Sequence, residues 1–299
     1  MRFIFSIVST CALAYGGYFF YQNHPDVVEN ALGFFRQHLP SGEFQTLEIR
    51  YSADQVIGAN RRVLVKDKRH TLLEPQLRFY PYVLLEVKYS TPKKKTAEGV
   101  ILWSLVDGEM VIDTNKWTKT HGYEDCLNAH ATKAEFLILN LLAKNGGEME
   151  KTRLLAQLRS VAKNAGADAL LMSCQRKKLI VQQGNLVRLH FADPRLTQHP
   201  ITHVSQWLVT KPYRDATCIK KKYSISQIKS LATAAFGHDF AIRRTLEVYL
   251  PVYKIEVKNP DQTLMTTHWN AVTGTQITSP YAPPQKGEVL NLTDLLPSK

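Results

Sequence analysis

One short stretch of this chain gathers side chains that could bind a metal ion or act as a nucleophile. His121, Cys126 and His130 lie close together, with Glu124 and Asp125 between them. Thiolate and imidazole groups are zinc ligands, and a cysteine beside a histidine can act as a nucleophile. However, no second compact ligand pair follows Cys126-x-x-x-His130. We therefore expect Cys126 to pack inward as a small apolar side chain.

The motifs that mark common enzyme active sites are missing from the rest of the sequence. It contains no glycine-rich dinucleotide-binding or phosphate-binding loop, no H-E-x-x-H motif and no G-x-S-x-G motif. We predict a protein without enzymatic activity, with no catalytic residues, metal or cofactor and no small-molecule substrate. An enzyme that uses the Cys126 region ranks third among the functions considered.

Length and charge predict a modular, basic protein. A chain of 299 residues suggests two or three compact units. With 38 basic and 26 acidic residues the net charge is +12, which favours anionic partners such as nucleic acid, an anionic membrane surface or an acidic protein. The basic residues form short scattered clusters, so charge alone does not select one partner. The four cysteines include no C-x-x-C pair, and a zinc ribbon or thioredoxin-like site has no support.

The same residue pattern occurs twice in the chain. Each copy begins with Tyr-Ser-x-x-Gln, continues through a strand that starts at proline and ends in Glu-Val-Lys, and closes with Trp-x-x-x-x-Gly. Self-similarity in a fixed order indicates a duplicated structural domain. The residue pattern of each copy predicts a strand, a helix and two further strands, in that order. The matched residues are Tyr51, Ser52, Gln55, Pro81, Glu86, Trp103 and Gly108 in the first copy, and Tyr223, Ser224, Gln227, Pro251, Glu256, Trp269 and Gly274 in the second.

These repeated units resemble PepSY-type domains, in which a small helix lies on an antiparallel sheet and a late aromatic strand ends in a glycine turn. The resemblance implies modules with a binding or inhibitory role, exported and often tethered to a membrane, without catalytic residues of their own. We expect Trp103 and Trp269 to lie in or near the core of the sheet, because aromatic residues favour strands. A recognition role for these two residues is the alternative.

A different module lies between the two copies. Thr132 to Glu135 has the form of a capping box before an apolar helix, two shorter amphipathic helices follow, and Gly184-Asn185 separates the strands of a predicted hairpin. Three helices followed by a hairpin resemble a winged-helix module, whose third helix often enters the DNA major groove while the wing contacts phosphates. The cations at the corresponding positions are Arg176, Lys177, Lys178 and Arg188.

Winged helices also bind proteins, and Met172 is an unusual base-reading residue on the third helix. We therefore expect a protein partner, and we rank nucleic acid below it. An anionic membrane surface is a further partner that the charge would admit. The candidate binding residues are Arg176, Lys177, Lys178, Arg188, Trp103 and Trp269.

The N-terminus predicts a membrane anchor. Phe3 to Phe20 contains no charged residue, and eighteen helical residues span about 27 Å, close to the ~30 Å thickness of the bilayer core. We expect a signal-anchor with the N-terminus in the cytoplasm, because Arg2 precedes the segment, and with the soluble part outside the cytoplasm. A cleaved signal peptide with its site near Ala12-Leu13-Ala14 is the alternative, and a lipoprotein signal at Cys11 is a weaker one.

Together these patterns predict an α+β protein with an N-terminal membrane helix and two duplicated helix-on-antiparallel-sheet domains that flank a winged-helix-like insert. The function we expect is that of a membrane-anchored, non-enzymatic binding or scaffold protein that acts through protein–protein interaction. The alternative is a membrane-tethered winged-helix regulator that binds DNA. The predicted segments are 1–45 (transmembrane anchor and amphipathic stalk helix), 46–118 (first copy), 130–194 (winged-helix-like domain), 204–279 (second copy) and 280–299 (Pro-rich tail).

Overall fold

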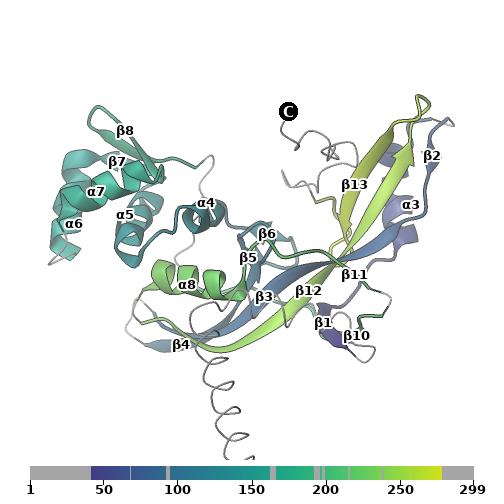
Figure 1. Ribbon diagram of the computed structural model, residues 1–299, viewed down its shortest axis with the longest axis horizontal. Helices are drawn as coiled ribbons and strands as arrows, with labels where there is room; N and C mark the ends of the chain where they lie inside the picture. The colour runs from purple at the N-terminus through teal and green to yellow at the C-terminus, as the bar shows by residue number, and fades with distance from the viewer. Residues whose placement is uncertain are drawn as a thin grey trace, which may run out of the picture.

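The computed structural model describes residues 42–277 except 68, 92–94, 162–165, 192–195, 197–198, 215 and 238. The described residues form one mixed α+β structure with a large curled sheet of ten strands, a small sheet of three strands and six helices (Figure 1). The expected α+β class is confirmed.

Two long antiparallel strands, β3 (Gln76–Ser90) and β12 (Ala241–Lys258), form the centre of the large sheet. The strand β4 (Thr96–Ser104) pairs with β3, and β13 (Leu264–Asn270) pairs with β12. Strands from the two predicted copies therefore share one sheet, and the predicted domain boundaries stay a prediction. The remaining strands are β1 (Glu43–Leu47), β2 (Thr71–Leu72), β5 (Met110–Asp113), β6 (Thr118–Lys119), β10 (Leu208–Pro212) and β11 (Thr217–Cys218).

Two helices, α3 (Ala53–Leu64) and α8 (Ile225–Phe236), lie at opposite ends of the long β3–β12 pair (Figure 1). Both begin with the same capping box: the side chain of Ser52 or Ser224 accepts from the backbone of a glutamine three residues later, and that glutamine side chain bonds back to the cap. Each capping box satisfies two backbone donors that the first turn leaves unpaired. The repeated Ser-x-x-Gln pattern thus sets both helix starts.

The register of the large sheet is symmetric about Tyr80 and Leu250, which lie opposite each other on β3 and β12. A pseudo-two-fold axis perpendicular to the sheet at this pair relates the first copy to the second. The two tryptophans occupy equivalent positions, one on β4 and one on β13. The symmetric pairs are Pro81–Tyr249 with Phe79–Pro251, and Val83–Trp103 with Tyr253–Trp269.

The helix of each copy packs on the strands of the other copy. The backbone N–H of Tyr51, just before α3, donates to the carbonyl of Ala271 after β13, and the N–H of Tyr223, just before α8, donates to the carbonyl of Leu105 after β4. The helix α3 accordingly shares a core with Trp269, and α8 shares one with Trp103. The strands that precede the helices are exchanged in the same way, because β1 pairs with β12 and β11 pairs with β3.

The insert between the copies has three helices and a three-stranded sheet in the order β7-β9-β8. It is joined to the large sheet through α4 (Tyr123–Asn128), and the side-chain amide of Asn140 on α5 donates to the carbonyl of Ala235 on α8 at 3.2 Å. A continuous apolar core therefore runs from the insert to α8. The elements of the insert are α5 (Lys133–Lys144), β7 (Glu148–Glu150), α6 (Lys151–Val161), α7 (Ala167–Arg176), β8 (Ile180–Gln183) and β9 (Leu186–Leu189).

The expectation of a single-pass membrane protein is corrected. Within the part of the chain that the structure describes, no helix combines the length and the apolar character needed to cross a bilayer. The segment that the sequence favours as an anchor, residues 3–20, lies outside the described residues, as do the predicted stalk helix and the Pro-rich tail.

Candidate functional site

Both tryptophans of the repeated pattern are buried in the sheet. The indole N–H of Trp103 donates to the carbonyl of Gly108 at 2.7 Å, and that of Trp269 donates to the Thr267 hydroxyl at 2.9 Å. Neither ring offers a surface to a partner, and each closes the core beneath a helix. The alternative of a recognition role gains no support from this placement.

Cys126 and His130 of the cysteine–histidine stretch border a pocket of about 400 Å³, whose other side comes from α8. Cys126 is fully buried on α4, and its burial in apolar surroundings raises the pKa of the thiol well above the ordinary value. The neutral thiol is neither a good nucleophile nor a metal ligand. Within the described parts of residues 42–277, no group of three or more His, Cys, Asp or Glu side chains is placed to hold a metal ion.

One of the four predicted winged-helix cations serves the fold of the insert. The Lys177 ammonium lies 2.8 Å from Oε2 of Glu135, whose side chain is only 2% exposed. The hydroxyl of Ser173 donates to the other carboxylate oxygen, Oε1, at 2.7 Å, and the backbone N–H of Thr132 donates to Oε2 at 2.7 Å. Lys177 therefore ties the end of α7 to the start of α5.

The other three cations, Arg176, Lys178 and Arg188, are exposed and form no ion pair with a described residue. Arg176 lies one turn after Met172 on α7, where Met172 is 56% exposed, and Lys178 follows the end of that helix. Arg188 lies on β9, and its side chain points to the sheet face away from the buried Val187 and Leu189. The only acidic side chain on α7, Asp168, lies 3.7 Å from Arg159 of α6. The outer face of the third helix thus combines an exposed thioether with cations at its C-terminal end.

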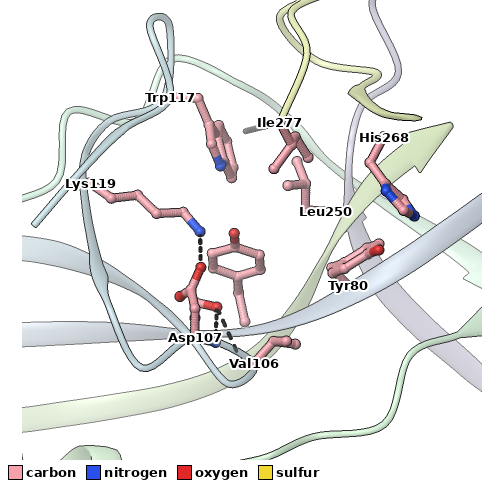
Figure 2. Close-up of a pocket in the computed structure, with 10 residues that line it drawn as sticks. Tyr80, Val106, Asp107, Trp117, Lys119, Leu250, His268 and Ile277 are labelled. Atoms are coloured by element: carbon pink, nitrogen blue, oxygen red, sulfur yellow. Dashed lines mark hydrogen bonds and ion pairs between the residues drawn. The ribbon is translucent and has the colours of Figure 1, made fainter. Parts of the chain in front are cut away.

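A pocket that the sequence did not indicate lies on the face of the large sheet opposite α3 and α8. Its volume is about 50 Å³, and Figure 2 shows its side chains converging from several elements. Tyr80 and Leu250, the pair at the pseudo-two-fold axis, form its floor. The residues around it are Tyr80, Tyr82, Ser104, Val106, Asp107, Trp117, Lys119, Leu250, His268 and Ile277.

An ion pair stands at one end of the pocket. The Lys119 ammonium lies 2.5 Å from Oδ2 of Asp107 and 5.3 Å from the centre of the Tyr82 ring (Figure 2). Burial by itself would raise the pKa of Asp107, but the charge and hydrogen bond of Lys119 outweigh burial and hold that pKa below its ordinary value. Burial would likewise lower the pKa of Lys119, and Asp107 raises it instead. Both groups are therefore charged at neutral pH.

Among the described residues, two pocket side chains carry buried nitrogen atoms without a partner in hydrogen-bond geometry, Nε1 of Trp117, which lies near the Tyr82 hydroxyl, and Nε2 of His268. His268 is only 7% exposed. Burial lowers its pKa, and the positive charges of Arg78 and Lys254 lower it further. The imidazole is thus neutral at physiological pH, and its surroundings have a positive potential.

No protein-family model, curated protein or solved structure matches this chain.

The sequence did not indicate the pocket, because its residues are far apart in the chain and carry no motif. Asp107 belongs to the Asp-Gly turn that the sequence does predict, and Trp117-x-Lys119 follows shortly after it. The other end of the pocket comes from β12 and β13, more than a hundred residues later. Only the pairing of β3 with β12 brings these groups together.

Proposed function

We propose that this chain is a non-enzymatic binding protein in which a winged-helix-like insert binds a protein partner and two copies of a duplicated PepSY-like unit carry that insert. The observation that supports it best is the exposure of Met172 on α7, at 56% of its surface. Methionine adapts to varied partner surfaces, and burying one stabilises a complex by about 1.5–3 kcal/mol. A helix that reads DNA would place a polar or cationic side chain at that position.

The cations near Met172 define the kind of partner. Arg176 and Lys178 are exposed at the C-terminal end of α7, so a complementary surface would carry acidic residues beside the apolar contact. Lys177 contributes less to such a surface because Glu135 already holds it. The symmetric register of β3 and β12 supports the duplicated unit in this proposal, because matched residues of the two copies occupy equivalent positions.

Photo-crosslinking in cells tests the protein-binding proposal. A photoreactive amino acid replaces Met172 in one variant and Val63, a 62% exposed residue on the distant helix α3, in a control. We expect a discrete crosslinked protein from position 172 alone. The product should disappear when Arg176→Glu is added and persist with Lys133→Glu, a change of the same charge at the exposed start of α5. Equal products from positions 172 and 63, or products insensitive to Arg176→Glu, would contradict the proposal.

A DNA-binding regulator is the second candidate, and the exposed, unpaired Arg176, Lys178 and Arg188 favour it. Each phosphate contact steepens the dependence of affinity on salt by about −0.9 in a log–log plot. If the three cations contact phosphates, charge reversal of Lys178 and Arg188 should flatten the slope by about two contacts. We expect weak binding without sequence preference, attributable to the net charge of +12. Nanomolar, sequence-specific binding at physiological salt would place DNA binding first.

A further inference from the structure

Four buried nitrogen atoms without a hydrogen-bond partner among the described residues belong to one face of the large sheet. Arg78 shares that face with Tyr80, since side chains two residues apart on a strand point the same way. His268 and Asn270 lie on the same face from β13, and of these two His268 borders the pocket. Trp117 covers the face from the turn before β6. The four atoms are Arg78 Nε, Trp117 Nε1, His268 Nε2 and Asn270 Nδ2.

These atoms call for hydrogen-bond acceptors. The indole, guanidinium and amide nitrogens can only donate, and a buried donor without an acceptor costs about 1–3 kcal/mol. Unpartnered buried groups are few in native proteins, so their concentration on one face is informative. A ligand that carries acceptor oxygens would satisfy the donor that Trp117 directs at the pocket.

Comparing symmetry-related residues on the two faces of the large sheet distinguishes positions that the fold requires from positions that it leaves free. On the face that packs against the helices, Pro81 matches Pro251 and Trp103 matches Trp269. On the pocket face two of the equivalent pairs differ in chemistry: Tyr80 matches Leu250, and Leu102 matches His268. A third pair, Ser104 and Asn270, is alike, because both side chains accept from backbone N–H groups of the following turn. Leucine is compatible with the fold at the first two positions, so Tyr80 and His268 are polar for another reason.

The size and charge of the pocket narrow the class of ligand. A volume of about 50 Å³ has room for about three to five water-sized spheres, at about 10–15 Å³ each. The neighbouring charges include Arg78, Lys119 and Lys254 on the positive side. On the negative side, Asp107 is paired with Lys119 and accepts from the Glu109 N–H at 3.2 Å, and Glu256 is paired with Lys254 at 2.5 Å. A small anion with a short apolar part fits this combination.

We propose that this pocket binds a small monocarboxylate whose oxygens accept hydrogen bonds from Trp117 Nε1 and Lys119 Nζ and whose apolar end packs against Leu250. Figure 2 shows these three side chains on the border of the pocket, with Ile277 beside Leu250. The Tyr82 ring lies against both Trp117 and Lys119. The proposal is independent of the winged-helix-like insert. It adds a small-molecule site to a chain whose sequence indicated none.

The indole N–H signals of the four tryptophans provide the test in the full chain, with propionate as the probe. We expect the Trp117 signal, assigned by its loss in Trp117→Phe, to move downfield and saturate as propionate is added. The Trp103 and Trp269 signals should stay in place, because both groups already have acceptors. Trp207 is 76% exposed and reports nonspecific effects.

Two comparisons make the test decisive. Leu250→Phe fills the pocket without removing a polar group, and we expect it to abolish the saturable shift while the other three indole signals show an intact fold. Propionamide has nearly the same shape without the charge, and we expect it to bind at least tenfold more weakly. Equal binding of propionamide would overturn the assignment to a carboxylate. A Trp117 signal unmoved by propionate, or moved equally in Leu250→Phe, would overturn the site and leave water as the partner of these donors.

Discussion

The ring of Tyr51 packs against Gly274, although the two residues belong to different copies of the repeated pattern. A Cβ atom at Gly274 would lie 3.2 Å from Cγ of the tyrosine, and the backbone φ is +71°. The symmetry-related contact joins Tyr223 to Gly108, where φ is +69°. Each glycine turn therefore receives the aromatic residue that precedes the helix of the other copy. These two contacts hold the exchanged helices in place.

Alanine at Gly108 should destabilise the protein more than alanine at an uncrowded glycine. A Cβ atom at Gly108 would lie 2.7 Å from Leu127 Cδ1 and 3.1 Å from the Tyr223 ring, whereas one at Gly146, with φ of +77°, would meet nothing within 4 Å. Strain at positive φ costs about 1–2 kcal/mol at either site, and crowding at Gly108 adds about 1–3 kcal/mol. Urea unfolding of both variants measures the difference. Equal losses of unfolding free energy in the two variants would show that Leu127 and Tyr223 do not crowd a side chain at Gly108.

Removing the Lys177 charge should destabilise the insert between the two copies. Lys177→Met leaves the buried Glu135 carboxylate without its cation, and we expect a loss of about 2 kcal/mol, below the range for a fully buried pair because the lysine is partly exposed. Lys178→Met, at the neighbouring exposed position, should change stability by less than about 0.5 kcal/mol. Chemical denaturation followed by circular dichroism compares the two. A similar small effect of both changes would place Lys177 among the surface cations.

The same ion pair predicts a dependence on pH. Burial alone would raise the pKa of Glu135, but hydrogen bonds from Lys177, Thr132 and Ser173 lower it below the ordinary 4.5. A carboxylate with a lowered folded pKa contributes stability that is present above the unfolded pKa and is lost as pH falls through the folded value. Removing the ammonium raises the folded pKa of Glu135, so the stability difference between the wild type and Lys177→Met should shrink as pH falls, until the carboxyl is protonated in both folded proteins. Denaturation at several pH values checks this, and a constant difference down to pH 3 would contradict it.

The cysteines of the folded protein should react slowly with thiol reagents. Burial raises the pKa of Cys174 and of Cys218 from 9.0 to about 12, so the thiolate fraction at a given pH falls about a thousandfold relative to the unfolded chain. Cys126, with a pKa also raised by burial, should be at least as unreactive. Labelling kinetics of a Cys11→Ser variant at pH 8, native and in urea, give the ratio. Rapid native labelling of Cys126 would revive the enzyme hypothesis for this region.

Local structure was predictable where neighbouring residues in the sequence decide it. The Ser52 and Ser224 capping boxes mark both helix starts, and the proline-to-lysine pattern lies within the long strands β3 and β12. The helices and hairpin of the insert also lie close to the predicted positions. These features depend on caps, turns and periodicity, which act over a few residues.

The pairing of the two copies was not predictable in the same way. Because both copies carry the same pattern, each helix matches either set of strands, and the sequence does not distinguish packing within a copy from packing across copies. The length of β3 distinguishes the two arrangements. Leu77, near the start of β3, lies beside α3, whereas Val87 belongs to the core under α8, and about 33 Å of extended chain separates the two residues. The strands that α8 covers therefore lie at the far end of β3 from α3.

The sequence by itself determined the capped helices α3, α5 and α8, the long strands β3 and β12, and the repeat with its two glycine turns. Only the tertiary structure decided that the copies share one sheet, that Lys177 is held by Glu135, and that Trp117, Lys119 and His268 border one pocket. The physical reason is the range of the interactions involved. Caps and periodicity act between near neighbours in the chain, whereas the pocket exists because β3 and β12 pair across more than 150 residues of intervening sequence.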